Sequence, residues 1–161
     1  MKTRIIGLGN TILSDDGVGI FTVREVARRV AGTGCGADPD IVESEVAGFA
    51  LMELMAGWER VILVDCTQFD RLEAGTVLRL DQHDLRTCPR LCSAHEIDLP
   101  TALELGRRLG MAMPREIIVF GIQAEDARTF GGSLSPAAAR GMQRAVDLIL
   151  REVTDSNPRP T

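Results

Sequence analysis

The 161-residue sequence lacks several features that would place it in other protein classes. It has no excess of positive charge, because 18 Lys and Arg stand against 23 Asp and Glu, for a net charge of −5. Nucleic acids and acidic membranes are bound by basic surfaces, so we expect neither as a partner. No apolar run approaches the roughly 18 residues of a transmembrane helix. The short apolar run near the N-terminus precedes no cleavage site and therefore predicts a first strand, not a signal peptide.

Cysteine is scarce, and no C-x-x-C pair is present. The four cysteines are Cys35, Cys66, Cys88 and Cys92. A chain of this length with 45% apolar residues can bury a core without disulfides. We therefore expect reduced thiols, a cytoplasmic location and a monomer. Cys88, Cys92 and His95 have C-x₃-C-x₂-H spacing, which leaves a zinc site open if Cys66 or Asp65 completes it. The same spacing disfavours a redox dithiol.

The apolar patterning predicts one domain over residues 1–153, followed by a disordered tail over 154–161. Strands are expected over 4–9, 39–46, 60–66, 75–81 and 116–123, and helices over 17–32, 47–58, 98–110 and from Pro136 onwards. The run "VILV" in the third strand is typical of a central parallel strand that is buried on both faces. Only roughly ten residues separate this strand from the next, too few for a helical crossover, so the next strand should be antiparallel. The order predicts a three-layer α/β/α domain with an open, mostly parallel twisted sheet of about five strands and one antiparallel edge strand.

Two adjacent carboxylates, Asp15 and Asp16, follow the first predicted strand in "GLGNTILSDDGVG". Carboxylates in the first turn of a helix can cap it, and capping would explain one member of the pair. A dinucleotide site is disfavoured, because Ile12 stands where the third glycine of G-x-G-x-x-G belongs. The two negative charges would also repel a pyrophosphate. The second carboxylate therefore points to another role at this turn.

More acidic residues follow the ends of other predicted strands. These acids are Glu43, Glu45, Asp65 and Glu125. In an open α/β sheet, ligands bind beyond the carboxyl ends of the strands, so these side chains should gather at one edge. His95 precedes the third predicted helix on the same edge. Two carboxylates and one imidazole, from Asp16, Asp65 and His95, could hold a divalent ion such as Ni²⁺, Zn²⁺ or Mn²⁺ and leave positions open.

At these residues the sequence resembles the nickel–iron hydrogenase maturation proteases. The first loop matches the family pattern of Gly-x-Gly-Asn, a short apolar stretch, Asp-Asp/Glu and a small residue. "VILVDC", "SAHEIDLPTAL" around His95 and "VFGIQAE" match three further motifs. The resemblance extends from about Ile5 to Leu150.

The resemblance implies an aspartic-type endopeptidase that removes the C-terminal extension of a hydrogenase large-subunit precursor after nickel insertion. The metal-contacting and catalytic residues of the family map onto Asp16, Asp65 and His95. Family members are described as isolated without metal, so the nickel is expected to arrive with the substrate and the protein itself to be metal-poor. The sequence departs from the family at 43–48, where "ESEVAG" replaces an Asp-Gly-Gly-Thr stretch linked to substrate choice. We therefore expect Glu43, Glu45 and Glu125 to contact the substrate.

Peptide hydrolysis needs an activated water and a polarised carbonyl, and a metal can supply both. A carboxylate could serve as the general base, either directly or through the metal. No Ser-His-Asp or Cys-His set supports a covalent route. Two alternatives stay open: a non-catalytic nickel carrier, and a zinc-dependent hydrolase that uses Cys88, Cys92 and His95.

Overall fold

The computed structural model describes residues 1–31, 39–46, 49–81, 83–84 and 99–155. The strands are β1 (Thr3–Leu8), β2 (Asp40–Ser44), β3 (Arg60–Thr67), β4 (Val77–Asp81) and β5 (Glu116–Gln123). The helices are the 3-10 helix η1 (Ser14–Gly17) and the α-helices α1 (Val18–Val30), α2 (Phe49–Met55), α4 (Leu99–Arg108) and α5 (Pro136–Asp155). The strand and helix order predicted from the apolar patterning is therefore confirmed.

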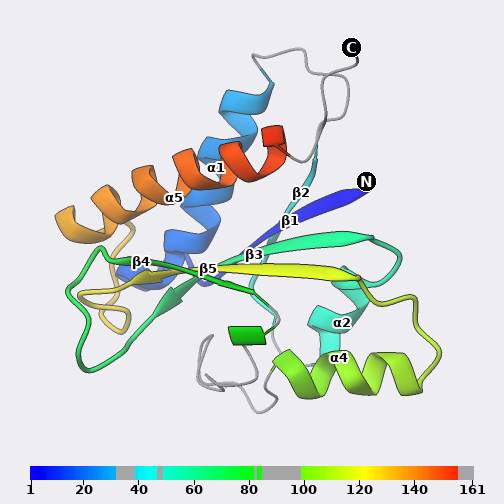
Figure 1. Cartoon of the computed structure of the whole chain (residues 1–161). Coiled ribbons are helices and arrows are strands. Elements are labelled where there is room, and N and C mark those ends of the chain that lie inside the picture. Colours follow the sequence, from blue (N-terminus) through cyan, green and yellow to red (C-terminus); the bar gives the residue numbers. More distant parts are fainter. Residues whose placement is uncertain (32–38, 47–48, 82, 85–98, 156–161) are drawn as a thin grey trace.

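The five strands form one sheet in the order β2-β1-β3-β5-β4. β1, β2, β3 and β5 are parallel, and β4 pairs antiparallel with β5 at the edge. Both the central position of β3 and the antiparallel edge strand agree with the prediction. The parallel strands all point toward one edge, where the loops after β1, β3 and β5 meet (Figure 1).

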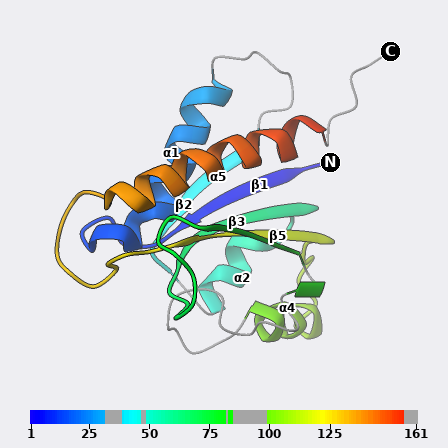
Figure 2. The ribbon, with the colours of Figure 1, turned by 60° about the vertical axis from the view of Figure 1, so that its left-hand side comes forward.

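Helices cover both faces of the sheet. α1 and α5 lie on one face, and α2 and α4 lie on the other (Figures 1 and 2). Every residue of β3 is buried, because its alternate side chains enter both layers. Ile62 and Val64 pack in the α1/α5 layer, whereas Val61 and Leu63 pack in the α2/α4 layer. Each such buried aliphatic side chain stabilises the fold by about 1.5–3 kcal/mol.

Gly19 sets the close approach of α1 to the sheet. A Cβ atom at this position would collide with the carbonyl oxygens of Leu8 and Val64. The second glycine of "GVG" therefore lets the first turn of α1 lie directly over β1 and β3. This contact places η1, which comes just before α1, beside the carboxyl end of β3.

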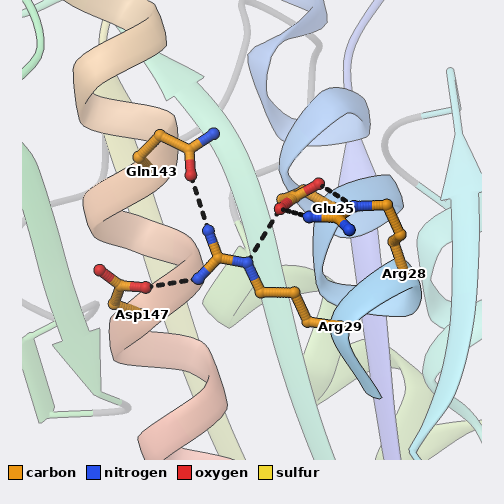
Figure 3. A network of polar contacts seen from close by, with 5 residues as sticks. All are labelled: Glu25, Arg28, Arg29, Gln143 and Asp147. Carbon is orange, nitrogen blue, oxygen red and sulfur yellow. Dashed lines mark hydrogen bonds and ion pairs between the residues drawn. The ribbon is translucent and has the colours of Figure 1, made fainter. Parts of the chain in front are cut away.

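A polar network joins α1 to α5 on the outside of the molecule (Figure 3). Glu25 accepts hydrogen bonds from Arg28 and Arg29, at 2.7 and 2.9 Å from its Oε1. Arg29 also reaches Asp147 at 2.7 Å and Gln143 at 2.8 Å on α5. The two guanidinium groups lower the pKa of Glu25 to about 2. Exposed pairs of this kind contribute little individually, but this network fixes how α5 lies against α1.

Arg60 holds the end of α5 against the start of β3. Its side chain is only 2% exposed, and it donates to the backbone carbonyl of Glu152 at 2.9 Å and to the carboxylate of Glu152 at 2.6 Å. A third contact joins Arg60 to Glu116 at 3.2 Å.

α5 continues to Asp155, so its last turn includes two residues of the stretch expected as a tail, and residues 156–161 lie outside the described part of the chain. Within the part of the chain that the structure describes, none of the helices combines the length and the apolar character that crossing a membrane requires.

Candidate functional site

The loop between β1 and η1 turns sharply at Gly9. Gly9 has a φ of +132°, and a Cβ atom there would collide with the carbonyl oxygen of Asp16. Its N–H donates to the carbonyl of Ser44 at 3.2 Å, which ties the loop to the end of β2. The second glycine of Gly-x-Gly-Asn, Gly9, is thus required for the loop to fold back and bring Asp16 next to the strand ends.

Asp16 lies between its own loop and the end of β3. Its Oδ2 accepts the backbone N–H of Asn10 at 2.9 Å, and its Oδ1 lies 3.5 Å from the Sγ of Cys66. The residue is partly exposed. The structure therefore brings Asp16 into contact with Cys66, the residue that directly follows Asp65. The grouping of Asp16 with Asp65 and His95 stays a prediction.

Asp65 is fully buried near the end of β3. Its Oδ1 accepts the backbone N–H of Cys66 at 2.8 Å. Burial raises the pKa of the Cys66 thiol, and the negative charges of Asp65 and Asp16 raise it further. The end of β3 is therefore a strongly negative environment, which favours a cation over an anionic ligand.

Asp15 caps neither η1 nor α1, so the interpretation of this member of the pair as a helix cap is wrong. η1 has Leu13 at its N-cap and no side-chain cap hydrogen bond. Asp15 is instead 0% exposed and reaches across to the loop after β5. It accepts the backbone N–H groups of Glu125, Asp126 and Ser135 at 2.9, 3.2 and 2.6 Å, and the hydroxyl of Ser135 at 2.8 Å. These contacts are long-range in sequence, so local helix rules do not reveal them.

Ser135 links this carboxylate to the start of α5. Its Oγ accepts the N–H of Ala138 at 3.1 Å and so caps the helix that was predicted from Pro136 onwards. The same two loops are joined a second time, where Gly131 accepts from the N–H of Ser14 at 2.8 Å and donates to the carbonyl of Ile12 at 3.0 Å. The loop after β5 is therefore fixed against the loop that carries Asp16.

Gln123 organises the loop after β3 and has no counterpart in the sequence predictions. This buried side chain accepts the backbone N–H of Phe69 at 3.0 Å and donates to the carbonyl of Phe69 at 3.1 Å. Its Oε1 also lies 3.3 Å from the Oγ1 of Thr67. A glutamine at the end of the apolar run "EIIVFGIQ" is the sequence signal that could have indicated such a role.

The other acids of this edge differ in their surroundings. Glu43 forms a two-pronged ion pair with Arg24, at 2.9 and 2.7 Å, and this guanidinium lowers the pKa of Glu43. Glu45 and Glu125 are exposed after β2 and β5. Their expected contacts with the substrate stay a prediction.

His95 and the pair Cys88 and Cys92 lie outside the described residues. Of the predicted set of Asp16, Asp65 and His95, the structure therefore describes only the two aspartates. Within the described residues, no group of three or more His, Cys, Asp or Glu side chains could hold a metal ion. The alternative zinc site also falls outside this part of the chain.

Known proteins resemble this chain in both sequence and fold. The model of the hydrogenase maturation protease family, HycI, matches residues 22–152. Hydrogenase 2 maturation protease of Escherichia coli strain K12 is 25% identical over 160 residues, which cover 97% of this chain and 93% of that protein. The nickel–iron hydrogenase maturation protease HybD from Thermococcus kodakarensis is 26% identical and superposes with a TM-score of 0.72, covering 94% of this chain and 99% of that one. Because the family model spans most of the sequence, the chain belongs to the hydrogenase maturation protease family and is a hydrolase.

Proposed function

We propose that this protein is the endopeptidase that removes the C-terminal extension of a nickel–iron hydrogenase large-subunit precursor after nickel insertion. Membership of the maturation protease family supports proteolysis of a hydrogenase subunit. The observation that carries the proposal is the approach of Asp16 to the end of β3, where Cys66 lies 3.5 Å from it and directly follows Asp65. Two carboxylates from two family motifs thus lie at the edge where α/β sheets bind ligands.

The nickel belongs to the substrate in this proposal. Asp16, Asp65 and His95 offer two oxygen donors and one nitrogen donor, which are too few and too hard to hold nickel tightly against competing ligands. The two oxygens of Asp16 each have one contact, with the N–H of Asn10 and with the Sγ of Cys66. A carboxylate oxygen has a second lone pair, which an approaching cation could use. Thiolates of the precursor would supply the soft ligands, so cleavage becomes conditional on correct metal loading.

Hydrolysis then needs a water molecule and a base close to the scissile bond. The substrate's nickel would polarise the reacting groups when bound. Asp16 is the better candidate for taking a proton from water, because it is partly exposed whereas Asp65 is fully buried. Asp15 is excluded from this role, since four hydrogen bonds already occupy its buried carboxylate.

We also infer that the protein acts in the cytoplasm as a monomer. Its four cysteines are few for a secreted protein and support a reducing compartment. Its net negative charge supports a protein substrate and disfavours binding to nucleic acids or acidic membranes. Sedimentation of the purified protein tests the monomer. Fractionation of cells tests the location.

Substitutions of the three predicted residues test the proposed site. Asp16→Asn, Asp65→Asn and His95→Ala should each abolish cleavage of the nickel-loaded precursor and leave the circular dichroism spectrum unchanged. Asp147→Asn serves as the matched control, because this carboxylate is exposed on α5 and should tolerate the change. Retained cleavage in Asp16→Asn would remove Asp16 from the site.

The zinc hydrolase is tested in the same series. Cys88→Ser and Cys92→Ser should leave cleavage nearly unchanged, and elemental analysis of the purified protein should find little metal. Loss of a bound zinc together with activity in either cysteine variant would favour that alternative. An intact precursor in every reaction, with nickel bound to the protein, would favour the carrier.

A further inference from the structure

Cys66 occupies a particular place at the end of β3. Successive strand residues face opposite sides of the sheet, and Cys66 packs in the α1/α5 layer with Ile62 and Val64. The thiol is 6% exposed, and its Sγ lies 3.5 Å from the Oδ1 of Asp16. Cys66 is therefore the direct contact between β3 and the loop that carries Asp16.

The thiol is a hydrogen-bond donor in this contact. The Sγ of Cys66 donates to the Oδ1 of Asp16 at 3.5 Å. A carboxylate accepts hydrogen bonds and has no proton to donate, so the S–H group supplies the proton of this contact. Sulfur is a weak donor in water, but its contact with an ionised acceptor in a partly buried site is stronger.

The Asp16 carboxylate is thus held at both oxygens. The N–H of Asn10 holds Oδ2 at 2.9 Å and the thiol of Cys66 holds Oδ1 at 3.5 Å. The first contact alone restrains Oδ2 and leaves Oδ1 without a fixed partner. With the second contact, the plane of the carboxylate is fixed relative to β3.

We propose that Cys66 is a positioning residue, whose S–H group holds the Asp16 carboxylate in the orientation that meets the metal of the substrate. The inference rests on the proposed function for its catalytic consequence, but not for the geometry itself. Groups that orient a metal-binding side chain typically change affinity or activity 10–100-fold when they are removed. Cys66 would do so here without touching the metal.

Cys66→Ala and Cys66→Ser form a matched pair, because both shorten the side chain and only serine keeps a donor. Cleavage of the nickel-loaded precursor should fall about 10–100-fold in kcat/KM for Cys66→Ala. Cys66→Ser should recover most of this loss. Ile62→Val removes one methylene from the same layer of the same strand and should leave kcat/KM unchanged, which controls for a general packing defect.

A second measurement reads the geometry without any substrate. Three-bond NMR couplings of Asp16 should report one χ1 rotamer in the unaltered protein and in Cys66→Ser, and averaging over rotamers in Cys66→Ala. Equal kcat/KM in Cys66→Ala and the unaltered protein would overturn the inference, and so would a Cys66→Ser variant as impaired as Cys66→Ala. If the unaltered protein leaves the precursor whole, the proposed function fails, while the couplings of Asp16 still decide the role of Cys66.

Discussion

Asp15→Ala should destabilise the protein far more than the loss of a helix cap would. The carboxylate is fully buried and accepts three backbone N–H groups and one hydroxyl, all from the loop after β5 and the start of α5. Hydrogen bonds to a charged group contribute about 1.5–3 kcal/mol each, but the loop relaxes and water enters when the acceptor is lost. We therefore expect the free energy of unfolding to fall by about 3–5 kcal/mol, as it does when one partner of a buried charge interaction is removed.

If Asp15 only capped a helix, Asp15→Ala would lower the free energy of unfolding by about 0.5–2 kcal/mol. A helix cap and a buried link between two loops therefore predict measurably different losses. Urea unfolding followed by circular dichroism measures the difference, and the melting temperature should fall by about 10 °C for a chain of this size. Asp126→Ala is the matched control in the same loop, because its carboxylate accepts local N–H groups of Arg128 and Thr129 that water can also bind. Equal losses in Asp15→Ala and Asp126→Ala would refute the role assigned to Asp15.

Two further predictions concern the first loop and the outer network. Gly9→Ala should lower the free energy of unfolding more than Gly57→Ala. Both glycines have positive φ, at +132° and +80°. A Cβ atom at Gly9 would collide with the backbone of Asp16, whereas nothing lies within 4 Å of a Cβ atom at Gly57. Urea midpoints of the two variants measure this, and equal shifts would contradict the steric argument. Glu25→Gln tests the pH dependence of the α1–α5 network. Because the folded pKa of Glu25 is lowered from 4.5 to about 2, its ion pairs stabilise the protein above pH 4.5 and this contribution is lost as the pH falls to about 2. The stability difference between the unaltered protein and Glu25→Gln should therefore shrink over that range, and a difference that grows in acid would contradict it.

The fold could be predicted from the sequence because its elements obey local rules. The run of β3 is apolar without alternation, and a strand buried on both faces of a parallel sheet requires this pattern. The short link between β3 and β4 excludes a helical crossover, which makes β4 antiparallel. Ser135 and Pro136 mark the start of α5 by capping chemistry that depends only on neighbouring residues.

The interior of the candidate site could be predicted only in part. The approach of Asp16 to the end of β3 follows from the rule that ligand sites lie at the carboxyl edge, and from the family motifs. The hydrogen bond between Asp15 and Ser135 joins residues that are 120 positions apart. It depends on how two loops are arranged in the folded protein, so local sequence rules do not predict it. The contact between Cys66 and Asp16 could likewise not be predicted, because sequence spacing does not show that a thiol on β3 reaches a carboxylate from another loop.

The dependence of cleavage on nickel tests the central claim most directly. One large-subunit precursor is prepared with and without nickel, incubated with the purified protein, and followed by mass spectrometry for loss of the C-terminal extension. In the proposed function the metal arrives with the substrate, because the side chains of the site supply too few donors to hold nickel alone. The loaded precursor should therefore be cut, and the nickel-free precursor should stay whole. Equal cutting of both forms would contradict metal recognition by this site.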